Sequence, residues 1–318
     1  MVNITGTKSC VPSVPKAGFS IMAGPIRRVV IVGGTHGNEL TGIYLVKKFQ
    51  QDPRLLYRQS FESITLLANP EAIAANRRYI DRDLNRCFGN EDLADSTLTS
   101  YEDQRAKAIA AQLGPKSQPK ADVIIDLHST TSNMGLTVLP SSKNPLNLGL
   151  AAYLSSLNPL VRVCLGVKCN QDASVLRSLS PLGCTLEVGA IAQGVLHADH
   201  FQQTEQLIHA ILDYFDALNQ GKALSGPLSL SVYQMISSVD YPRDASGELQ
   251  AIIHPQLQSK DYQPLSNGEP MFLTFTGESI PYRGEDTIYP VFINEAAYYE
   301  QQIAMTLTLK QQLSLEIV

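Results

Sequence analysis

The chain has 318 residues, of which 44% are hydrophobic and 17% are charged, so it can form one large or two medium-sized domains with a sizeable core. The net charge of -5 argues against a generally basic surface for nucleic acid. No apolar run reaches the length of a membrane span, and the first residues lack a signal-peptide pattern. The five cysteines are scattered without a C-x-x-C pair, which favours reduced thiols and a cytoplasmic location.

Apolar strands and amphipathic helices alternate after a loose N-terminal extension at residues 1–25. The alternation predicts an α/β domain over residues 26–222, with a mixed, mostly parallel sheet flanked by helices. The predicted strands are Arg28–Gly33, Ser63–Ala68, Asp122–Leu127, Leu136–Leu139, Val161–Val167 and Cys184–Val188, and the predicted helices are Leu40–Gln50, Glu71–Asn76, Tyr101–Leu113, Asn147–Leu157 and Ala198–Leu218.

Helical periodicity fades near the junction of residues 222 and 223, and short strands separated by Gly, Pro and Asn turns follow. This pattern predicts a smaller, β-rich C-terminal domain over residues 223–318. Its expected strands are Leu228–Ile236, Leu249–Ile253, Met271–Phe275, Val291–Ile293 and Met305–Leu315.

A metal-competent pair follows the first strand at a glycine-rich turn. His36 and Glu39 are three residues apart, a spacing that puts both side chains on one face at the start of a helix. Catalytic zinc takes three mixed imidazole and carboxylate ligands and keeps one position open. The pair alone is weak evidence, because a polar helix surface produces the same spacing.

His128 directly follows the strand of residues 122–127 and is the best candidate for a third ligand. The carboxyl ends of parallel strands meet at one edge of a sheet, where ligands bind. Asp126 lies two residues earlier and would point the same way in an extended strand, so it could orient an imidazole. The alternative is a hydrogen-bonded core histidine.

Glu187 is an acid inside a buried strand, where an unpaired charge is costly. One interpretation is a salt bridge to an arginine. The other is a general base that takes a proton from a zinc-activated water and delivers it to a leaving amine.

The segment between the second strand and the third is unusually rich in arginine. It carries Arg78, Arg82 and Arg86, together with Asp83 and Asn85. Such charge runs are often solvated surface, but planar guanidinium groups also match carboxylates in bidentate geometry. Arg177 could add a further cation. A zinc ion beside several arginines would suit an anionic substrate that bears a carbonyl group.

These motifs occur in the order found in a known family. The chain resembles the aspartoacylase and succinylglutamate desuccinylase family of the zinc carboxypeptidase-like superfamily, which also contains aminoacylase-3. The resemblance runs from about Arg28 to the C-terminus. It rests on the segments Gly33–Glu39, Asn69-Pro70, Arg78–Asp81 with Asp83–Arg86, Asp126–Gly135, Glu187–Gly189 and Tyr289–Glu300.

The resemblance implies a carboxypeptidase-like domain whose entrance is narrowed by the β-rich domain. It implies one zinc ion held by His36, Glu39 and His128, and hydrolysis of N-acetyl-L-aspartate to acetate and aspartate. Glu187 would then be the general base and Arg78 would polarise the carbonyl. The residues implied to hold substrate carboxylates are Asn85, Arg86, Arg177 and Tyr298.

One position departs from the family pattern. Ala173 stands where the family carries a substrate-contacting tyrosine, four residues before Arg177. Loss of that hydroxyl leaves deacylation of other N-acyl amino acids open, as in aminoacylase-3. A metal-binding or anion-binding module without catalysis is the alternative from another class. The expected partner is a small anionic substrate, without nucleic acid or membrane, and homo-oligomerisation is left open.

Overall fold

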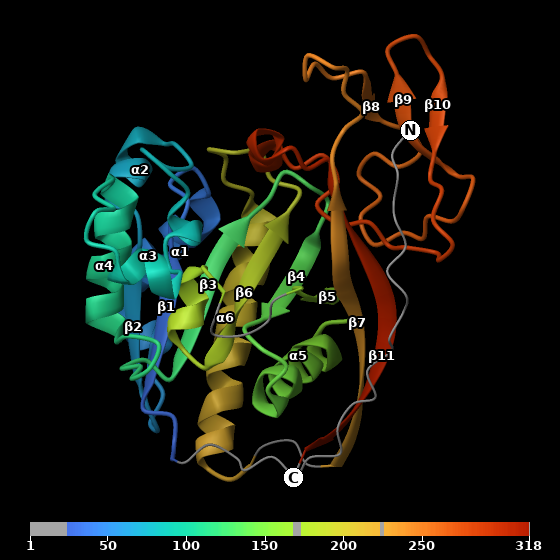
Figure 1. Cartoon of the computed structure of the whole chain (residues 1–318). Helices are drawn as coiled ribbons and strands as arrows, with labels where there is room; N and C mark the ends of the chain where they lie inside the picture. Colours follow the sequence, from blue (N-terminus) through green and yellow to red (C-terminus); the bar gives the residue numbers. More distant parts are fainter. Residues whose placement is uncertain (1–23, 168–172, 223–225, 318) are drawn as a thin grey trace.

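A computed structural model describes residues 24–167, 173–222 and 226–317 of the chain. An eight-stranded sheet runs through the molecule in the order β11-β7-β5-β4-β6-β3-β1-β2 (Figure 1). The pairs β4–β6 and β7–β11 are antiparallel and the others are parallel, which confirms the predicted mixed sheet. Its strands are β1 (Arg28–Gly33), β2 (Glu62–Leu67), β3 (Val123–Ser129), β4 (Gly135–Pro140), β5 (Val161–Leu165), β6 (Leu182–Gly189), β7 (Gly226–Val239) and β11 (Met305–Ile317).

Helices cover both faces of this sheet. Side chains alternate along β1, so that Val29 and Ile31 pack in one core cluster and Val30 and Val32 in another. The first cluster includes residues of α1 (Leu40–Gln51), α5 (Pro145–Leu157) and α6 (Ala198–Asn219), and the second includes α4 (Tyr101–Leu113). The short helices are α2 (Pro70–Ala75) and α3 (Asn90–Ala94). Among the described residues, no helix has the length and apolar character needed to cross a bilayer.

The C-terminal region combines two long strands with a small separate sheet. β7 and β11 form one antiparallel pair that extends the central sheet. The small sheet contains β8 (Ala251–Ile253), β9 (Pro270–Thr274) and β10 (Ser279–Pro281), and has its own core around Met271, Phe272 and Tyr282. β10 lies outside the predicted elements.

The predicted strand Val291–Ile293 is wrong. Val291 forms only an isolated bridge with Thr306. The next residue, Phe292, has a φ of 52°, and Asn294 has a φ of 58°. Left-handed backbone of this kind interrupts an extended strand, whatever the β-propensity of the side chains.

The ends of three parallel strands create the edge on which the site is built. β3 pairs with β1 on one side and with β6 on the other, and the register places His128 beside Glu187. A 3-10 helix of the C-terminal region, η4 (Ala296–Gln301), lies above this edge and is red in Figure 1. Segments from both parts of the chain therefore meet at the carboxyl ends of β1, β3 and β6.

Candidate active site

The turn after β1 is shaped by two glycines. Gly34 has a φ of 69°, which glycine adopts without a steric cost. At Gly37, an added Cβ would lie 2.1 Å from a backbone carbon of Ala72, so only glycine fits there. His36 and Glu39 both precede α1, and Glu39 is its N-cap residue. Their convergence is thus a property of the turn and not of the helix face that the spacing suggested.

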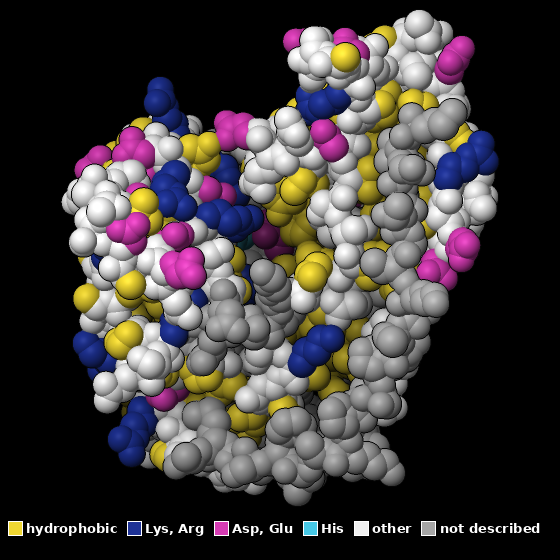
Figure 2. Space-filling view, in the orientation of Figure 1, with side chains coloured by type: hydrophobic (Ala, Val, Ile, Leu, Met, Phe, Trp, Pro, Cys, Tyr) yellow, Lys and Arg dark blue, Asp and Glu magenta, His cyan; other side chains and the backbone are white. Residues whose placement is uncertain are grey.

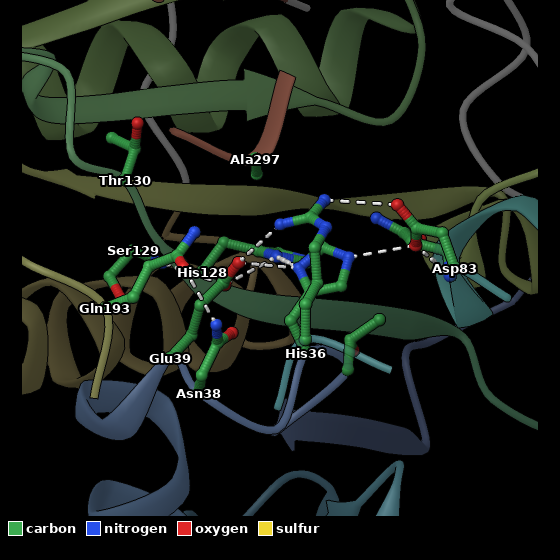
Figure 3. A network of polar contacts seen from close by, with 12 residues as sticks. His36, Asn38, Glu39, Asp83, His128, Ser129, Thr130, Gln193 and Ala297 are labelled. Atoms are coloured by element: carbon green, nitrogen blue, oxygen red, sulfur yellow. Dashed lines mark hydrogen bonds and ion pairs between the residues drawn. The ribbon is translucent and has the colours of Figure 1, made fainter. Parts of the chain in front are cut away.

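His36, Glu39 and His128 point toward one another in a buried cluster (Figure 3). The Glu39 carboxylate bridges the two rings, since Oε1 lies 2.6 Å from Nδ1 of His36 and Oε2 lies 3.0 Å from Nδ1 of His128. The two Nδ1 atoms are 3.1 Å apart, and one ligand atom from each residue falls within 4.8 Å of the others. The three side chains are close enough to share one ion.

The outer nitrogens of both rings face carboxylates. Nε2 of His36 is 3.0 Å from Oδ1 of Asp83, and Nε2 of His128 is 2.9 Å from Oδ2 of Asp126. The His36–Asp83 contact is a hydrogen bond, which favours a proton on Nε2 of His36 and leaves its Nδ1 for a metal ion. Two imidazole Nδ1 atoms and a carboxylate that converge in this way fit a divalent cation, and this donor set is typical of zinc.

Charge partners inside the cluster keep it ionised. Burial alone would raise the pKa of Glu39, but His36 and His128 outweigh it and hold that pKa well below its usual range. Burial likewise opposes charge on His128, yet Asp126 and Glu39 raise its pKa well above the ordinary value. The cluster is therefore a place where positive charge is strongly favoured.

Glu187 lies on β6 directly opposite His128. Burial raises the pKa of Glu187 to about 8, and the carboxylates of Glu39 and Glu295 act in the same direction. Within the described residues Glu187 forms no ion pair with an arginine, so the salt-bridge interpretation finds no support. A buried carboxyl group with a raised pKa beside this cluster is suited to proton transfer.

Arg78 reaches the cluster from the loop before η2 (Leu84–Arg86). Nη1 donates to Oε1 of Glu39 at 3.2 Å, and Nη2 donates to Oδ2 of Asp83 at 3.1 Å. Asp83 thus holds the guanidinium group of Arg78 in place. The buried Nε of Arg78 has no hydrogen-bond partner in the part of the chain that the structure describes. An unmatched donor at this point is available to a substrate oxygen.

The other predicted anion-binding residues surround the same space. Arg86 is exposed, and Nη1 of Arg177 donates to Oγ1 of Thr185 at 3.1 Å. Asn85 is fixed because its Oδ1 accepts from the Leu176 amide at 2.9 Å. Burial, together with the nearby Glu187 carboxylate, raises the pKa of Tyr298, so this phenol remains a hydrogen-bond donor.

One cavity of about 160 Å³ is lined by the candidate metal-binding and substrate-binding side chains. Drug-sized ligand pockets span about 300–1,000 Å³, so the volume favours a small molecule. Figure 2 shows a recess near the middle of the face in view. Lys and Arg side chains lie on its left and hydrophobic side chains on its right. The predicted residues in the lining are His36, Glu39, Arg78, Asn85, Arg86, His128, Arg177, Glu187 and Tyr298. Residues that sequence reasoning missed include Leu139, Met235, Phe292 and Glu295.

Glu295 joins the C-terminal region to the loop after His128. Its Oε2 accepts hydrogen bonds from the hydroxyl of Thr130 and from the backbone amides of Thr131 and Ser132. Its Oε1 accepts from the amide of Ala297 and caps η4, which carries Tyr298. The only sequence signal was an acid inside the Tyr289–Glu300 motif, and its partners in the loop after β3 are more than 160 residues away.

Replacing Glu295 should therefore be costly. Glu295→Ala leaves several buried donors unmatched, and hydrogen bonds to a charged group contribute about 1.5–3 kcal/mol each. We expect the free energy of unfolding, measured by urea denaturation of zinc-saturated protein, to fall by at least about 2 kcal/mol. Glu295→Gln, which keeps the side-chain shape, should lose less. Wild-type stability of Glu295→Ala would show that these bonds do not hold the two parts together.

Ala173, the residue that departs from the family pattern, is absent from the described lining of the cavity. Its carbonyl accepts from Nζ of Lys116 at 2.7 Å and from Oγ of Ser178 at 2.7 Å. The side chain of Ala173 is a single methyl group, so the phenol that the family places here has no replacement at this position.

Two family models match the chain. The model described as the succinylglutamate desuccinylase/aspartoacylase catalytic domain matches residues 25–215, and the AstE/AspA barrel-sandwich hybrid domain matches residues 228–310. The sequence is 54% identical to a probable aspartoacylase of Nostoc sp., over 90% of this chain and 97% of the relative. It is 44% identical to the N-acyl-aromatic-L-amino acid amidohydrolase (carboxylate-forming) of Mus musculus, over 88% and 89% of the two chains.

Solved structures show the same fold. Murine aminoacylase 3 superimposes with a TM-score of 0.89 at 41% identity, over 93% of this chain and 99% of that one. Succinylglutamate desuccinylase from Vibrio parahaemolyticus gives a TM-score of 0.60 at 16% identity, which is a likeness of fold alone. The chain therefore belongs to the succinylglutamate desuccinylase/aspartoacylase family.

Proposed function

We propose that the protein is a zinc-dependent amidohydrolase that removes the acyl group from N-acyl-L-amino acids, with N-acetyl-L-aspartate as its substrate. The observation that carries the proposal is the convergence of His36, Glu39 and His128 beside Glu187 in a cavity that is also lined by arginines. The family and its amidohydrolase relatives support the same reaction class.

Proton transfer is assigned to Glu187. When bound by His36, Glu39 and His128, zinc supplies a Lewis acid that lowers the pKa of water and polarises a carbonyl group. The Glu187 carboxylate accepts a proton from the attacking water and later donates it to the departing amine nitrogen. N-acetyl-aspartate and water then yield acetate and aspartate, and Glu187 returns to its starting state.

Arg78 is assigned to the acyl carbonyl oxygen. Its guanidinium group is held by Glu39 and Asp83, and its Nε is left without a partner among the described residues. A donor fixed in advance stabilises the charge that develops on the carbonyl oxygen without reorganising during the reaction.

The aspartate part of the substrate is assigned to the polar side of the cavity. Arg86 and Arg177 provide guanidinium groups for its carboxylates, and Asn85 and Tyr298 add neutral donors. Several donors on one small substrate fix its orientation toward Glu187.

A second substrate class is favoured by the apolar part of the lining. Leu139, Met235 and Phe292 also line the cavity, and Ala173 lacks the family phenol. A relative at 44% identity is named for N-acyl-aromatic amino acids. The alternative is therefore deacylation of other N-acyl amino acids, aromatic ones included.

The direct test is release of acetate from a panel of N-acetyl amino acids by the zinc-loaded protein. N-acetyl-L-aspartate should give the highest kcat/KM, and a chelator should abolish turnover until zinc is restored. A preference for N-acetylated aromatic amino acids would support the second class. If no substrate released acetate while zinc and acidic ligands still bound, the protein would be the non-catalytic module.

Arg86→Ala tests whether Arg86 binds a carboxylate of the substrate. Loss of one guanidinium should raise KM for N-acetyl-L-aspartate by about 10- to 100-fold, because a charge-assisted hydrogen bond contributes about 1.5–3 kcal/mol. For a substrate without a carboxylate, such as N-acetyl-L-alanine amide, KM should change by less than about threefold.

Arg162→Ala is the matched control, because this arginine hydrogen-bonds to the backbone carbonyl of Pro159, away from the cavity. Equal increases in KM for acidic and neutral substrates in the Arg86 variant would show that Arg86 does not bind a substrate carboxylate.

A further inference from the structure

We infer that Glu102 is a positioning residue that holds the arginine-rich loop, and with it Arg78, in its active geometry. This inference rests on the proposed function and deepens it. Glu102 lies in the first turn of α4, outside the cavity, and its side chain is fully buried, with 0% of its surface exposed. No charged side chain in the described part of the chain forms an ion pair with it.

The partners of the Glu102 carboxylate are mainly consecutive backbone amides. Oε1 accepts from the amide of Ile80 at 2.7 Å, and Oε2 accepts from the amides of Asp81 at 2.9 Å and Arg82 at 3.2 Å. Successive amides that converge on one anion form a concave nest. Here the anion belongs to the protein itself, so the loop is folded around a side chain from a different element.

The arginine-rich loop and the first turn of α4 also contact each other through other residues. Oδ2 of Asp81 accepts from the amide of Tyr101 at 2.8 Å, and Nη1 of Arg82 donates to Oδ1 of Asp103 at 2.8 Å. Glu102 also accepts from Nδ2 of Asn69 at 3.1 Å. The first turn of α4 and the loop therefore dock through both backbone and side chains, with Glu102 at the centre.

Arg78 lies between this anchor and the metal-ligand turn. Its carbonyl oxygen accepts from the Gly37 amide at 3.2 Å, next to His36. Two residues further along the chain, the amide of Ile80 is fixed by Glu102. With the backbone held on both sides, the guanidinium reaches Glu39 and Asp83. Without Glu102, the Gly37 contact remains but the loop beyond Arg78 loses its acceptor.

Glu102→Gln is the sharpest substitution. It keeps the shape of the side chain but turns one acceptor oxygen into an NH₂ group that faces amide donors. We expect kcat/KM for acetate release to fall by about 100-fold, the loss that follows a displacement of about 1 Å of a catalytic group. Zinc content should stay at the wild-type level, since Glu102 contacts none of the three ligands.

A double-mutant cycle with Arg78→Ala separates positioning from general destabilisation. If Glu102 acts through Arg78, then adding Glu102→Gln to Arg78→Ala should lower kcat/KM by less than about threefold. Asp122→Asn is the matched control: its Oδ2 also accepts from two consecutive backbone amides, those of Arg27 and Arg28, but at the start of β1 and outside the cavity lining. It should lower thermal stability but change kcat/KM by less than about threefold.

Equal losses from Glu102→Gln in both backgrounds, or a kcat/KM within threefold of wild type, would overturn the inference. Hydrogen exchange of the zinc-loaded protein provides a readout without turnover. The amides of Ile80, Asp81 and Arg82 should exchange much faster in Glu102→Gln, and unchanged exchange would also overturn the inference. Should the wild type release no acetate from any substrate, the proposed function fails, and the exchange measurement still decides whether Glu102 holds the loop.

Discussion

Glu187→Gln is expected to retain full zinc content and to lose about 100- to 10,000-fold in kcat, the range attributed to general acid–base catalysis. The amide has nearly the shape of the carboxylate, so the cavity should stay intact. It cannot accept a proton from water or return one to the amine. Because Glu187 is not one of the three residues proposed to hold the metal, metal binding should be nearly unchanged.

Steady-state acetate release measured together with zinc content per chain checks this result. Glu205→Gln is the matched control, because this carboxylate pairs with Lys48 on the surface formed by α1 and α6. Its kcat should equal that of the wild type. A zinc-replete Glu187→Gln variant with near wild-type kcat would assign proton transfer to another group.

His128→Ala is expected to lose both the metal and the activity. Removing one of the three proposed ligands leaves His36 and Glu39, and Asp126 loses the ring that it faces. Loss of a residue that merely supports a ligand costs about 10- to 100-fold in metal affinity, so loss of a ligand should cost at least about 100-fold. Turnover at limiting zinc should fall to the background rate.

Competition with a chromogenic chelator measures that affinity. His209→Ala is the control, because it removes an imidazole of α6 that contacts Glu205 and not the cluster. Its zinc affinity should match the wild type. Unchanged zinc affinity in His128→Ala would mean that the ion binds elsewhere.

Much of the fold was predictable because hydrophobic periodicity is a local signal. β1 and α4 match their predicted ranges, and other core strands differ by a few residues at their ends. The short strand β10 was missed because its three residues are partly exposed and carry no apolar pattern. Val291–Ile293 was misassigned because left-handed backbone, set by contacts with distant residues, overrode local β-propensity.

Part of the site was predictable because its chemically reactive side chains lie at or near the ends of strands. His36 and His128 are far apart in sequence, yet His36 follows β1 and His128 lies near the end of β3, and the ends of such parallel strands meet at one edge. Glu187 was recognised because a charged side chain in a buried, apolar strand is costly unless it is paired or functional. The role assigned to Tyr298 came from the family resemblance alone, since nothing in the spacing of residues links η4 to the sheet edge.

The supporting residues could not be found in this way. In sequence, Glu102 is an ordinary acid in the first turn of a helix, where the helix dipole favours it. Only the folded chain brings the amides of Ile80, Asp81 and Arg82 onto its carboxylate. Glu295 is similar, because its donors belong to a loop in the other half of the molecule.

The central claim is that two imidazoles and one carboxylate bind a single zinc ion, and the X-ray absorption spectrum of the dialysed protein at the zinc edge tests it most directly. The account predicts about one zinc per chain with nitrogen and oxygen neighbours at about 2.0–2.2 Å and imidazole outer-shell features. A sulfur neighbour at about 2.3 Å, or a spectrum unaltered by His128→Ala, would contradict it.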